Sequence, residues 1–221
     1  MRKQVRQIFS LQYIKMKRVF DRYRSVSTLF EETSLGEDDI QSYKRFIDIT
    51  FDEKIKFYSF DNVEFINCTF TSDIVNSVFN NVKFEKCEMS NITLDKCGIQ
   101  KCLFESCHMV GFNLLESSVK NTDFKATNLM MANMDESNLK NVIFENVKLT
   151  SATMTKMSFE DMELNDVDFE GTEFYSTSLA GLDLTKSNIS GILVEPDMIR
   201  GVIVNNDQAI DFINLLGIVI K

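Results

Sequence analysis

The sequence lacks most of the residues that catalytic and metal sites require. Its only histidine is His108, and none of its five cysteines belongs to a C-x-x-C pair. A histidine-based triad, a zinc site and a framework of paired disulfides therefore all lack essential parts. A Gly-rich phosphate-binding loop is missing too. We expect a protein that is not an enzyme and that holds no cofactor and no metal ion.

Long hydrophobic runs are absent as well. No stretch approaches the roughly 18 uncharged apolar residues that a membrane-spanning helix needs, and the first residues contain no apolar core followed by a small-residue cleavage site. The chain has 221 residues, of which 44% are hydrophobic, which is the size and composition of one soluble domain. A cytoplasmic location is the expectation.

Charge is distributed unevenly along the chain. The net charge is -9, but residues 1–45 contain ten Lys and Arg against six Asp and Glu, and residues 46–221 contain 14 against 27. The chain therefore divides near residue 46 into a basic segment and a longer acidic part.

A five-residue repeat dominates the acidic part. From Phe79 to Val204 every fifth residue is apolar, at 26 positions without exception. The same spacing links Phe60, Phe65 and Phe70, and a nine-residue step to Phe79 indicates one shortened repeat near Ile74. A period of five fits neither an α-helix nor a flat strand, so the pattern predicts a repeat architecture over residues 46–204.

A second set of small residues lies two positions before the large ones, and it includes all five cysteines. Residues two apart share a face of an extended segment, so each unit is expected to point one large and one small side chain inward. The cysteines are then buried core residues. Five of the eight glycines lie two positions after the large residue, where the chain is expected to turn a corner: Gly111, Gly171, Gly181, Gly191 and Gly201.

These units resemble those of the pentapeptide-repeat family, which read roughly A-(D/N)-L-x-x. Ala132–Glu136 and Ser137–Asn141 match as they stand, and the resemblance covers about residues 58–204. It implies an all-β fold: a right-handed quadrilateral β-helix with one repeat on each side. We name the four sides after the inward residues Phe79, Phe84, Met89 and Leu94. Phe84, Phe104, Phe124 and Phe144 recur every 20 residues and are expected to stack as one ladder.

Residues 205–221 follow a different pattern. Asn206 or Asp207 can cap a short helix, and Gly217 can end it before a terminal apolar strand. One interpretation is a simple cap for the open last coil. The other is homodimerisation through the excess apolar surface of this tail, with the following interface residues: Phe212, Leu215, Leu216, Ile218, Val219 and Ile220.

The end of the chain also resembles the Qnr quinolone-resistance proteins and, more distantly, MfpA. The resemblance is carried by Leu182–Ser187, Ile199–Val202, Gln208–Ala209 and Leu216–Ile220. It implies a C-terminal dimer that mimics DNA in shape and charge and binds DNA gyrase or topoisomerase IV. The chain differs from Qnr proteins in having no long loop inserted in the rod and in its basic N-terminal segment.

Acidic residues are concentrated on two opposite sides of the expected rod. Between residues 77 and 206, the Phe84 side carries seven acids and four bases, and the Leu94 side carries six and two. The predicted partner-binding face is the Leu94 side, with Asp95, Glu116, Asp135, Glu136, Glu173 and Glu195. Because the rod is acidic, we expect it to bind no nucleic acid directly. The alternative is that the charges serve solubility alone.

Residues 1–45 are predicted to form a helical cap. Basic residues and helically spaced apolar residues between Met1 and Arg24 indicate an amphipathic helix. Such a helix could close the first coil, or it could contact nucleic acid or an anionic membrane. Two functions therefore stay open for the whole chain: a DNA-mimicking protein that binds a type II topoisomerase and confers quinolone or toxin resistance, and an interaction scaffold that binds another protein through flat β-faces.

Overall fold

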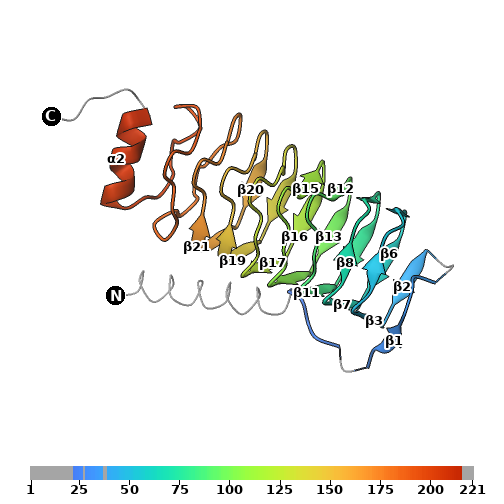
Figure 1. Ribbon diagram of the computed structural model, residues 1–221. Coiled ribbons are helices and arrows are strands. Elements are labelled where there is room, and N and C mark those ends of the chain that lie inside the picture. The colour runs from blue at the N-terminus through green and yellow to red at the C-terminus, as the bar shows by residue number, and fades with distance from the viewer. Residues whose placement is uncertain (1–21, 27, 37–38, 216–221) are drawn as a thin grey trace, which may run out of the picture.

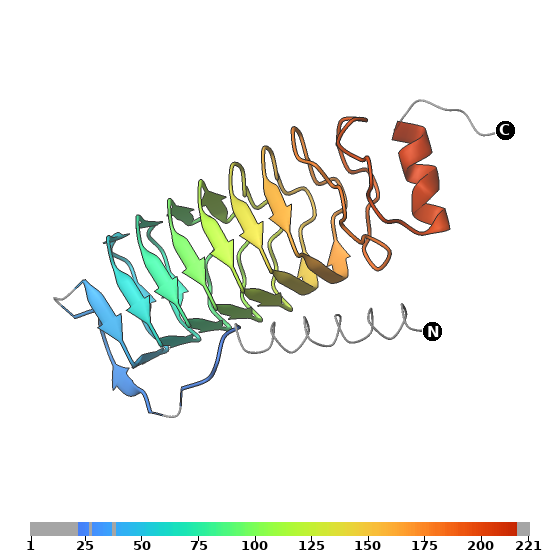
Figure 2. The ribbon, with the colours of Figure 1, turned by 180° about the vertical axis from the view of Figure 1, so that it is seen from behind.

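Four parallel β-sheets form the sides of a rod in the computed structural model, which describes residues 22–26, 28–36 and 39–215. The chain winds as a solenoid from β1 and β2 at one end to the helix α2 at the other (Figures 1 and 2). Four sides and an all-β rod with a short C-terminal helix confirm the predicted fold class. The right-handed winding of the β-helix, which the resemblance implies, stays a prediction.

The strands of the four sheets are short, and each pairs with the strand one coil before or after it. The Phe84 side contains β1 (Phe30–Glu32), β3 (Lys44–Ile47), β7 (Glu64–Ile66), β11 (Lys83–Glu85), β14 (Leu103–Glu105), β17 (Asp123–Lys125), β19 (Ile143–Lys148) and β21 (Glu163–Asp168). The Phe79 side contains β2 (Ile40–Ser42), β6 (Ser59–Asp61), β10 (Val78–Asn80), β13 (Gly98–Gln100), β16 (Ser118–Lys120), β18 (Asn138–Lys140) and β20 (Ser158–Glu160).

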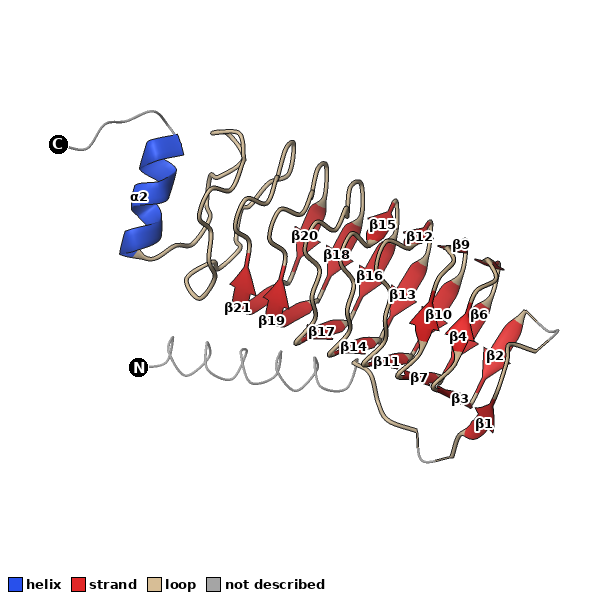
Figure 3. Ribbon diagram, in the orientation of Figure 1, coloured by secondary structure: helices blue, strands red, loops and turns tan. Residues whose placement is uncertain are grey.

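The other two sides have fewer regular strands. The Leu94 side contains β5 (Ile55–Lys56), β9 (Ile74–Val75), β12 (Thr93–Asp95) and β15 (Asn113–Leu115), and the Met89 side contains β4 (Thr50–Phe51) and β8 (Thr69–Phe70). Beyond β21 the coils continue as turns joined by single bridges, up to the pair Asp183 and Ile203 (Figure 3).

The predicted phenylalanine ladder forms the centre of the core. Phe46, Phe65, Phe84, Phe104 and Phe124 stack with ring centroids 4.7–5.1 Å apart and ring planes within 12° of parallel. This separation is close to the strand spacing, because each ring lies directly above its counterpart one coil away. Phe144 tilts by 59° from Phe124, and Leu164 takes the next position.

The small inward residues fix the register of the coils. All five cysteines are buried and unpaired, as predicted. Burial raises the pKa of the Cys97 thiol to about 11 and that of Cys102 to about 12, so both stay protonated near neutral pH. At Ser77, Ser117 and Ser137 the hydroxyl bonds the main chain: Ser117 Oγ, for example, donates to the Leu115 carbonyl at 2.8 Å and accepts from the Cys97 N–H at 3.0 Å.

Most corners of the coil use a residue with positive φ. The five glycines predicted at corners all have φ between 66° and 84°. Most other corners hold residues with a Cβ, for which this region costs about 1 kcal/mol or more. Asparagine is frequent among them, as at Asn62, Asn81 and Asn141, since its side chain tolerates this conformation.

The rod begins earlier than the repeat in the sequence. Partner residues are 19 apart between the first coils, as for Phe46 with Phe65 and Phe65 with Phe84, and 20 apart from β11 onward. This confirms a shortened repeat at Ile74 and places a second one at Ile55. The strands β1 and β2 lie within residues 1–45, before the boundary taken from charge. Of the helix predicted between Met1 and Arg24, residues 1–21 lie outside the described residues, and Arg22–Arg24 are not helical.

The C-terminal end of the rod is closed by α2 (Asn206–Leu215). Its N-cap is Asn205, one residue before the predicted cap. Asn205 Oδ1 accepts from the Gln208 N–H at 3.0 Å and Gln208 Oε1 accepts from the Asn205 N–H at 2.9 Å, which is a capping box. Gln208 Nε2 also donates to the carbonyls of Leu184 and Ser187, both at 2.7 Å.

Replacing Gln208 with alanine is expected to lower the free energy of unfolding by about 2–3 kcal/mol, because two carbonyls and the N-cap lose a buried partner. Urea denaturation followed by circular dichroism measures this. The control is Asn206→Ala, which changes an exposed residue of the same turn and should stay within about 0.5 kcal/mol of the parent. Equal effects of the two changes would show that Gln208 does not anchor the helix.

Candidate partner-binding surfaces

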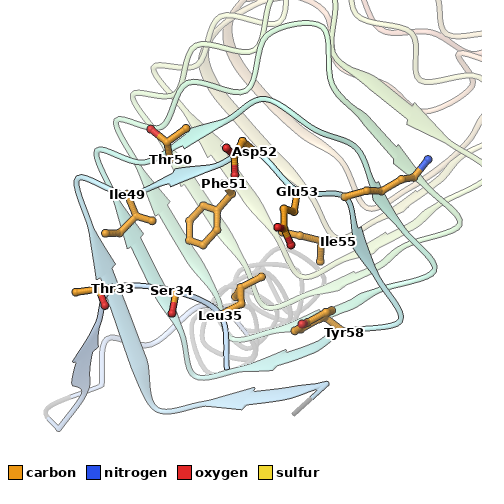
Figure 4. Close-up of a pocket in the computed structure, with 11 residues that line it drawn as sticks. Thr33, Ser34, Leu35, Ile49, Thr50, Phe51, Asp52, Glu53, Ile55 and Tyr58 are labelled. Carbon is orange, nitrogen blue, oxygen red and sulfur yellow. The ribbon is translucent and has the colours of Figure 1, made fainter. Parts of the chain in front are cut away.

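A hollow of about 320 Å³ opens at the N-terminal end of the rod, where β4 and β5 each pair on one side only. Thr33–Leu35, Ile49–Ile55 and Tyr58 line it (Figure 4). The hollow is open at this end because, among the described residues, the first coil has no further coil stacked on it. The lining contains no cysteine or histidine, and its Lys54 lies 3.7 Å from Asp73.

The six predicted acidic residues of the Leu94 side lie on the outer surface of the rod. None of them is buried: Asp95, Glu116, Asp135, Glu136, Glu173 and Glu195. Asp95, Asp135 and Glu195 come directly after an inward residue, Glu116 and Glu136 come two residues after one, and Glu173 comes directly before Phe174. The carboxylates therefore lie along the length of this side at three positions across its width, and we call this set the acidic row.

Two lysines interrupt this row. Lys96 Nζ lies 3.3 Å from Glu116 and 3.4 Å from Asp95, and Lys156 Nζ lies 2.9 Å from Glu136. Hydrogen bonds to Glu116 and to Glu136 raise the pKa of these two lysines. Both pairs are exposed, so each contributes little to stability.

The backbone fixes two other acids of this row. Asp135 Oδ1 accepts from the Thr155 N–H at 2.8 Å, and both carboxylate oxygens of Glu195 accept from the Ser176 N–H at 3.0 Å. Within the described residues no Lys or Arg forms an ion pair with Asp135, Glu173 or Glu195. Asp135 also attracts Lys156 and helps to raise the pKa of that lysine. Glu173 and Glu195 are thus the acids of this side that have no cation beside them among the described residues, and a backbone N–H fixes the position of Glu195.

The Phe84 side has more acids, but its lysines lie beside acids of their own strand or of the neighbouring strand. Lys83 of β11 lies 2.6 Å from Glu85 and 3.0 Å from Glu105 of β14. Burial of Lys83 is outweighed by these two hydrogen bonds, so its pKa is raised. Lys125 of β17 lies 3.6 Å from Glu145 of β19. This side is largely neutralised by its own bases.

The chain adds a further base to the Phe84 side from its N-terminal segment. Arg22 forms an ion pair with Asp123, and the side chains of both are mostly covered. Burial of Asp123 outweighs the attraction of Arg22, so the pKa of this carboxyl is raised. Sequence reasoning missed this contact. The basic composition of residues 1–24 was the only signal, and nothing in it pairs Arg22 with Asp123.

The predicted dimer residues lie at the opposite end of the rod, on and beyond α2. Phe212 is 7% exposed and packs against the core of the last coils. It therefore contributes to the cap within one chain. Ile210 on the same helix is exposed. The side chain of Leu215 and the residues Leu216, Ile218, Val219 and Ile220 lie outside the described part of the chain.

Three remaining features of the sequence concern the single histidine, metal binding and membrane spans. His108 is exposed, as its outward position predicts. The described residues contain no group of three His, Cys, Asp or Glu side chains that could hold a metal ion. No helix of the described chain is long and apolar enough to cross a membrane.

Two family models match the chain. The model of the pentapeptide repeat region matches residues 77–154, and the model of eight pentapeptide repeats matches residues 158–191, so together they cover just over half of the sequence. A comparison with curated proteins found no match.

Solved structures of similar fold include QnrB1, a plasmid-mediated fluoroquinolone resistance protein, with a TM-score of 0.43 and 14% identity over 82% of this chain and 98% of that chain. HetL, a pentapeptide repeat protein involved in heterocyst differentiation regulation from the cyanobacterium Nostoc sp. strain PCC 7120, has a TM-score of 0.31 and 11% identity over 73% of this chain and 92% of that chain.

Proposed function

We propose that this chain, which belongs to the pentapeptide-repeat family, is a non-enzymatic binding protein that presents a DNA-like acidic surface to a type II topoisomerase, DNA gyrase or topoisomerase IV. The observation that carries the proposal is the acidic row on the Leu94 side, whose six carboxylates are accompanied by only two lysines. A surface built to bind DNA phosphates is positive and responds to the spacing of charges along its partner. In this proposal the protein acts in the cytoplasm and protects its target from a quinolone or a toxin.

The Leu94 side fits this role better than the Phe84 side. On the Phe84 side Lys83, Lys125 and Arg22 each lie between or beside carboxylates. On the Leu94 side Glu173 and Glu195 have no Lys or Arg beside them among the described residues, and backbone N–H groups hold Asp135 and Glu195 in place. Carboxylates that are already ordered lose little side-chain entropy when a partner binds.

A gyrase supercoiling assay, with and without a fluoroquinolone, tests this function. The protein should either inhibit supercoiling or restore it in the presence of the drug, at concentrations that leave an unrelated acidic protein without effect. If neither reaction changes and the protein does not bind gyrase or topoisomerase IV, the proposal fails and the interaction scaffold described next takes its place.

The second candidate is an interaction scaffold, and the Phe79 side favours it. Its outer surface continues over seven paired strands and carries small or uncharged residues in one row: Ser59, Val78, Gly98, Ser118, Asn138 and Ser158. A flat face of this kind suits a protein partner of low charge. Binding through it should depend weakly on salt, whereas binding through the Leu94 side should fall steeply as salt is added.

Dimerisation through the tail is proposed as well. Because Gln208 and Phe212 hold α2 on the rod, a chain that ends at Leu215 should keep its cap and lose only Leu216–Lys221. We expect the full chain to sediment at about twice 25.5 kDa and the shortened chain to sediment as a folded monomer. Equal sedimentation of the two chains at micromolar concentration would remove residues 216–221 from the interface.

A further inference from the structure

A short segment of the N-terminal region, Arg22–Arg24, lies along the corner between the Phe79 and Phe84 sides. The Asn81 side chain pairs with the main chain of Arg24: its Oδ1 accepts from the Arg24 N–H at 2.7 Å, and its Nδ2 donates to the Arg24 carbonyl at 3.0 Å. Tyr23 donates its hydroxyl hydrogen to Glu64 at 2.7 Å. Asn81 thus holds a peptide backbone much as a neighbouring strand would, whatever side chain that residue carries.

The same corner contains a pocket for a guanidinium group. Arg22 donates to the Asp123 carboxylate, to the Thr122 carbonyl at 3.3 Å and to Asn141 Oδ1 at 3.1 Å. Its side chain is only 10% exposed. A carboxylate, a carbonyl and an amide oxygen arranged around one planar group match the fork of donors that distinguishes arginine from lysine.

The rod itself holds these acceptors in position. Asn141 donates to Asn121 Oδ1 at 2.7 Å, and Asn81 donates to Asn62 Oδ1 at 2.8 Å. Arg45 lies 2.7 Å from the Glu64 carboxylate that receives Tyr23. None of these contacts involves residues 22–24, so the groove is formed by the coils and not by the segment that fills it.

We propose that this corner groove is a binding site for an extended arginine-containing segment, which the chain fills with its own Arg22–Arg24 and which a basic protein partner occupies by displacing them. Carboxylates at Glu64 and Asp123 disfavour a phosphate group, so the occupant is a peptide and not a nucleic acid. The inference rests on the proposed function only in that the partner is basic, and the groove requires no topoisomerase.

Occupation by the chain's own segment regulates the site. A tethered segment competes at an effective concentration on the order of millimolar. A free peptide of equal intrinsic affinity is therefore excluded, and a partner must bind through additional contacts to displace Arg22–Arg24. The strap formed by these residues thus sets a threshold for partner binding along the Phe84 side.

A labelled peptide with the sequence of residues 20–28 tests the site on the full chain. The double variant Arg22→Ala, Tyr23→Ala should bind this peptide at least about tenfold more tightly than the parent chain, because the tethered competitor is weakened. Adding Asp123→Asn should remove most of that gain, and adding Glu173→Gln on the Leu94 side should leave it unchanged. Equal binding with and without Asp123→Asn, or no binding to the folded double variant, would overturn the proposal.

Limited trypsin digestion provides a second measurement, which does not need the double variant Arg22→Ala, Tyr23→Ala. Cleavage after Arg22 should be at least about tenfold faster in Asp123→Asn than in the parent chain, because the guanidinium leaves its pocket. Equal rates in two chains with the same circular dichroism would show that Asp123 does not hold the strap. No topoisomerase is present in either experiment. A negative result here therefore rejects the peptide-binding site without rejecting the proposed binding to a topoisomerase, which the supercoiling assay tests separately.

Discussion

Replacing Phe124 with alanine is expected to lower the free energy of unfolding by about 3–5 kcal/mol. Phe124 is 1% exposed, stacks on Phe104 at 4.7 Å and contacts Phe144 at 5.2 Å. The parallel coils cannot collapse into the space left by one ring, since the strand spacing keeps them apart. Chemical denaturation followed by circular dichroism measures the loss, and the melting temperature should fall by at least about 6 °C.

The matched control is Phe57→Ala, which removes the same side chain from a corner where it is 66% exposed. That change should stay within about 0.5 kcal/mol of the parent. If the two variants are equally stable, the ladder is not the centre of the core and the inward register assigned to Phe124 is wrong.

The sequence was sufficient to predict the body of this fold because a solenoid repeats one local rule. Every fifth residue must fill the core, and the residue two positions earlier must be small enough to lie beside it. The inward positions of Phe84, Phe104 and Phe124 therefore follow from spacing, and so do the corner glycines such as Gly171. Their stacking as one ladder follows from the four-sided coil that the family resemblance implies, since each residue then lies above its counterpart in the next coil.

The ends of the rod could not be predicted in this way, because an end coil lacks one neighbour. The spacing of Phe30, Leu35 and Ile40 suggests an early continuation of the repeat, but Ile40 is 67% exposed and Gln41 is the buried residue of β2. The Gln41 amide oxygen lies 3.5 Å from the Gly36 nitrogen, which an apolar side chain at this position could not bond. At the N-terminal end of the rod, a polar inward residue thus takes the place of the apolar one that the repeat would require.

The acidic faces show a different limit of sequence reasoning. Counting acids and bases on each side treats the Phe84 and Leu94 sides as similar. The structure separates them, because a base such as Lys83 lies between acids of two coils and Arg22 arrives from a distant part of the chain. Pairing across coils follows from the repeat, but the position of Arg22 depends on a segment outside it.

Reversing Glu116, Glu136 and Glu173 to lysine together is expected to weaken binding to gyrase or topoisomerase IV at least about tenfold, and far more than any single reversal. Attraction between a row of carboxylates and the positively charged DNA-binding surface of the enzyme is the sum of many modest charge–charge contacts along that face. Asp135 is left unchanged because it accepts a hydrogen bond from the Thr155 backbone, so its loss would confuse binding with stability. Binding is measured by titration at several salt concentrations.

The control for net charge is the triple reversal of Glu145, Glu160 and Asp166, which lies on the Phe84 and Phe79 sides. Two of its members lie beside a lysine, Lys125 or Lys140, just as Glu116 and Glu136 lie beside Lys96 and Lys156. Both triple variants therefore change net charge and local repulsion alike, and both should keep the thermal stability of the parent to within a few degrees. A loss confined to the first variant, with a shallower dependence on salt, identifies the Leu94 side as the contact face. Equal losses would show that overall charge causes the effect. No loss in either variant would refute the DNA-mimic proposal in favour of a scaffold that binds its partner through the Phe79 side.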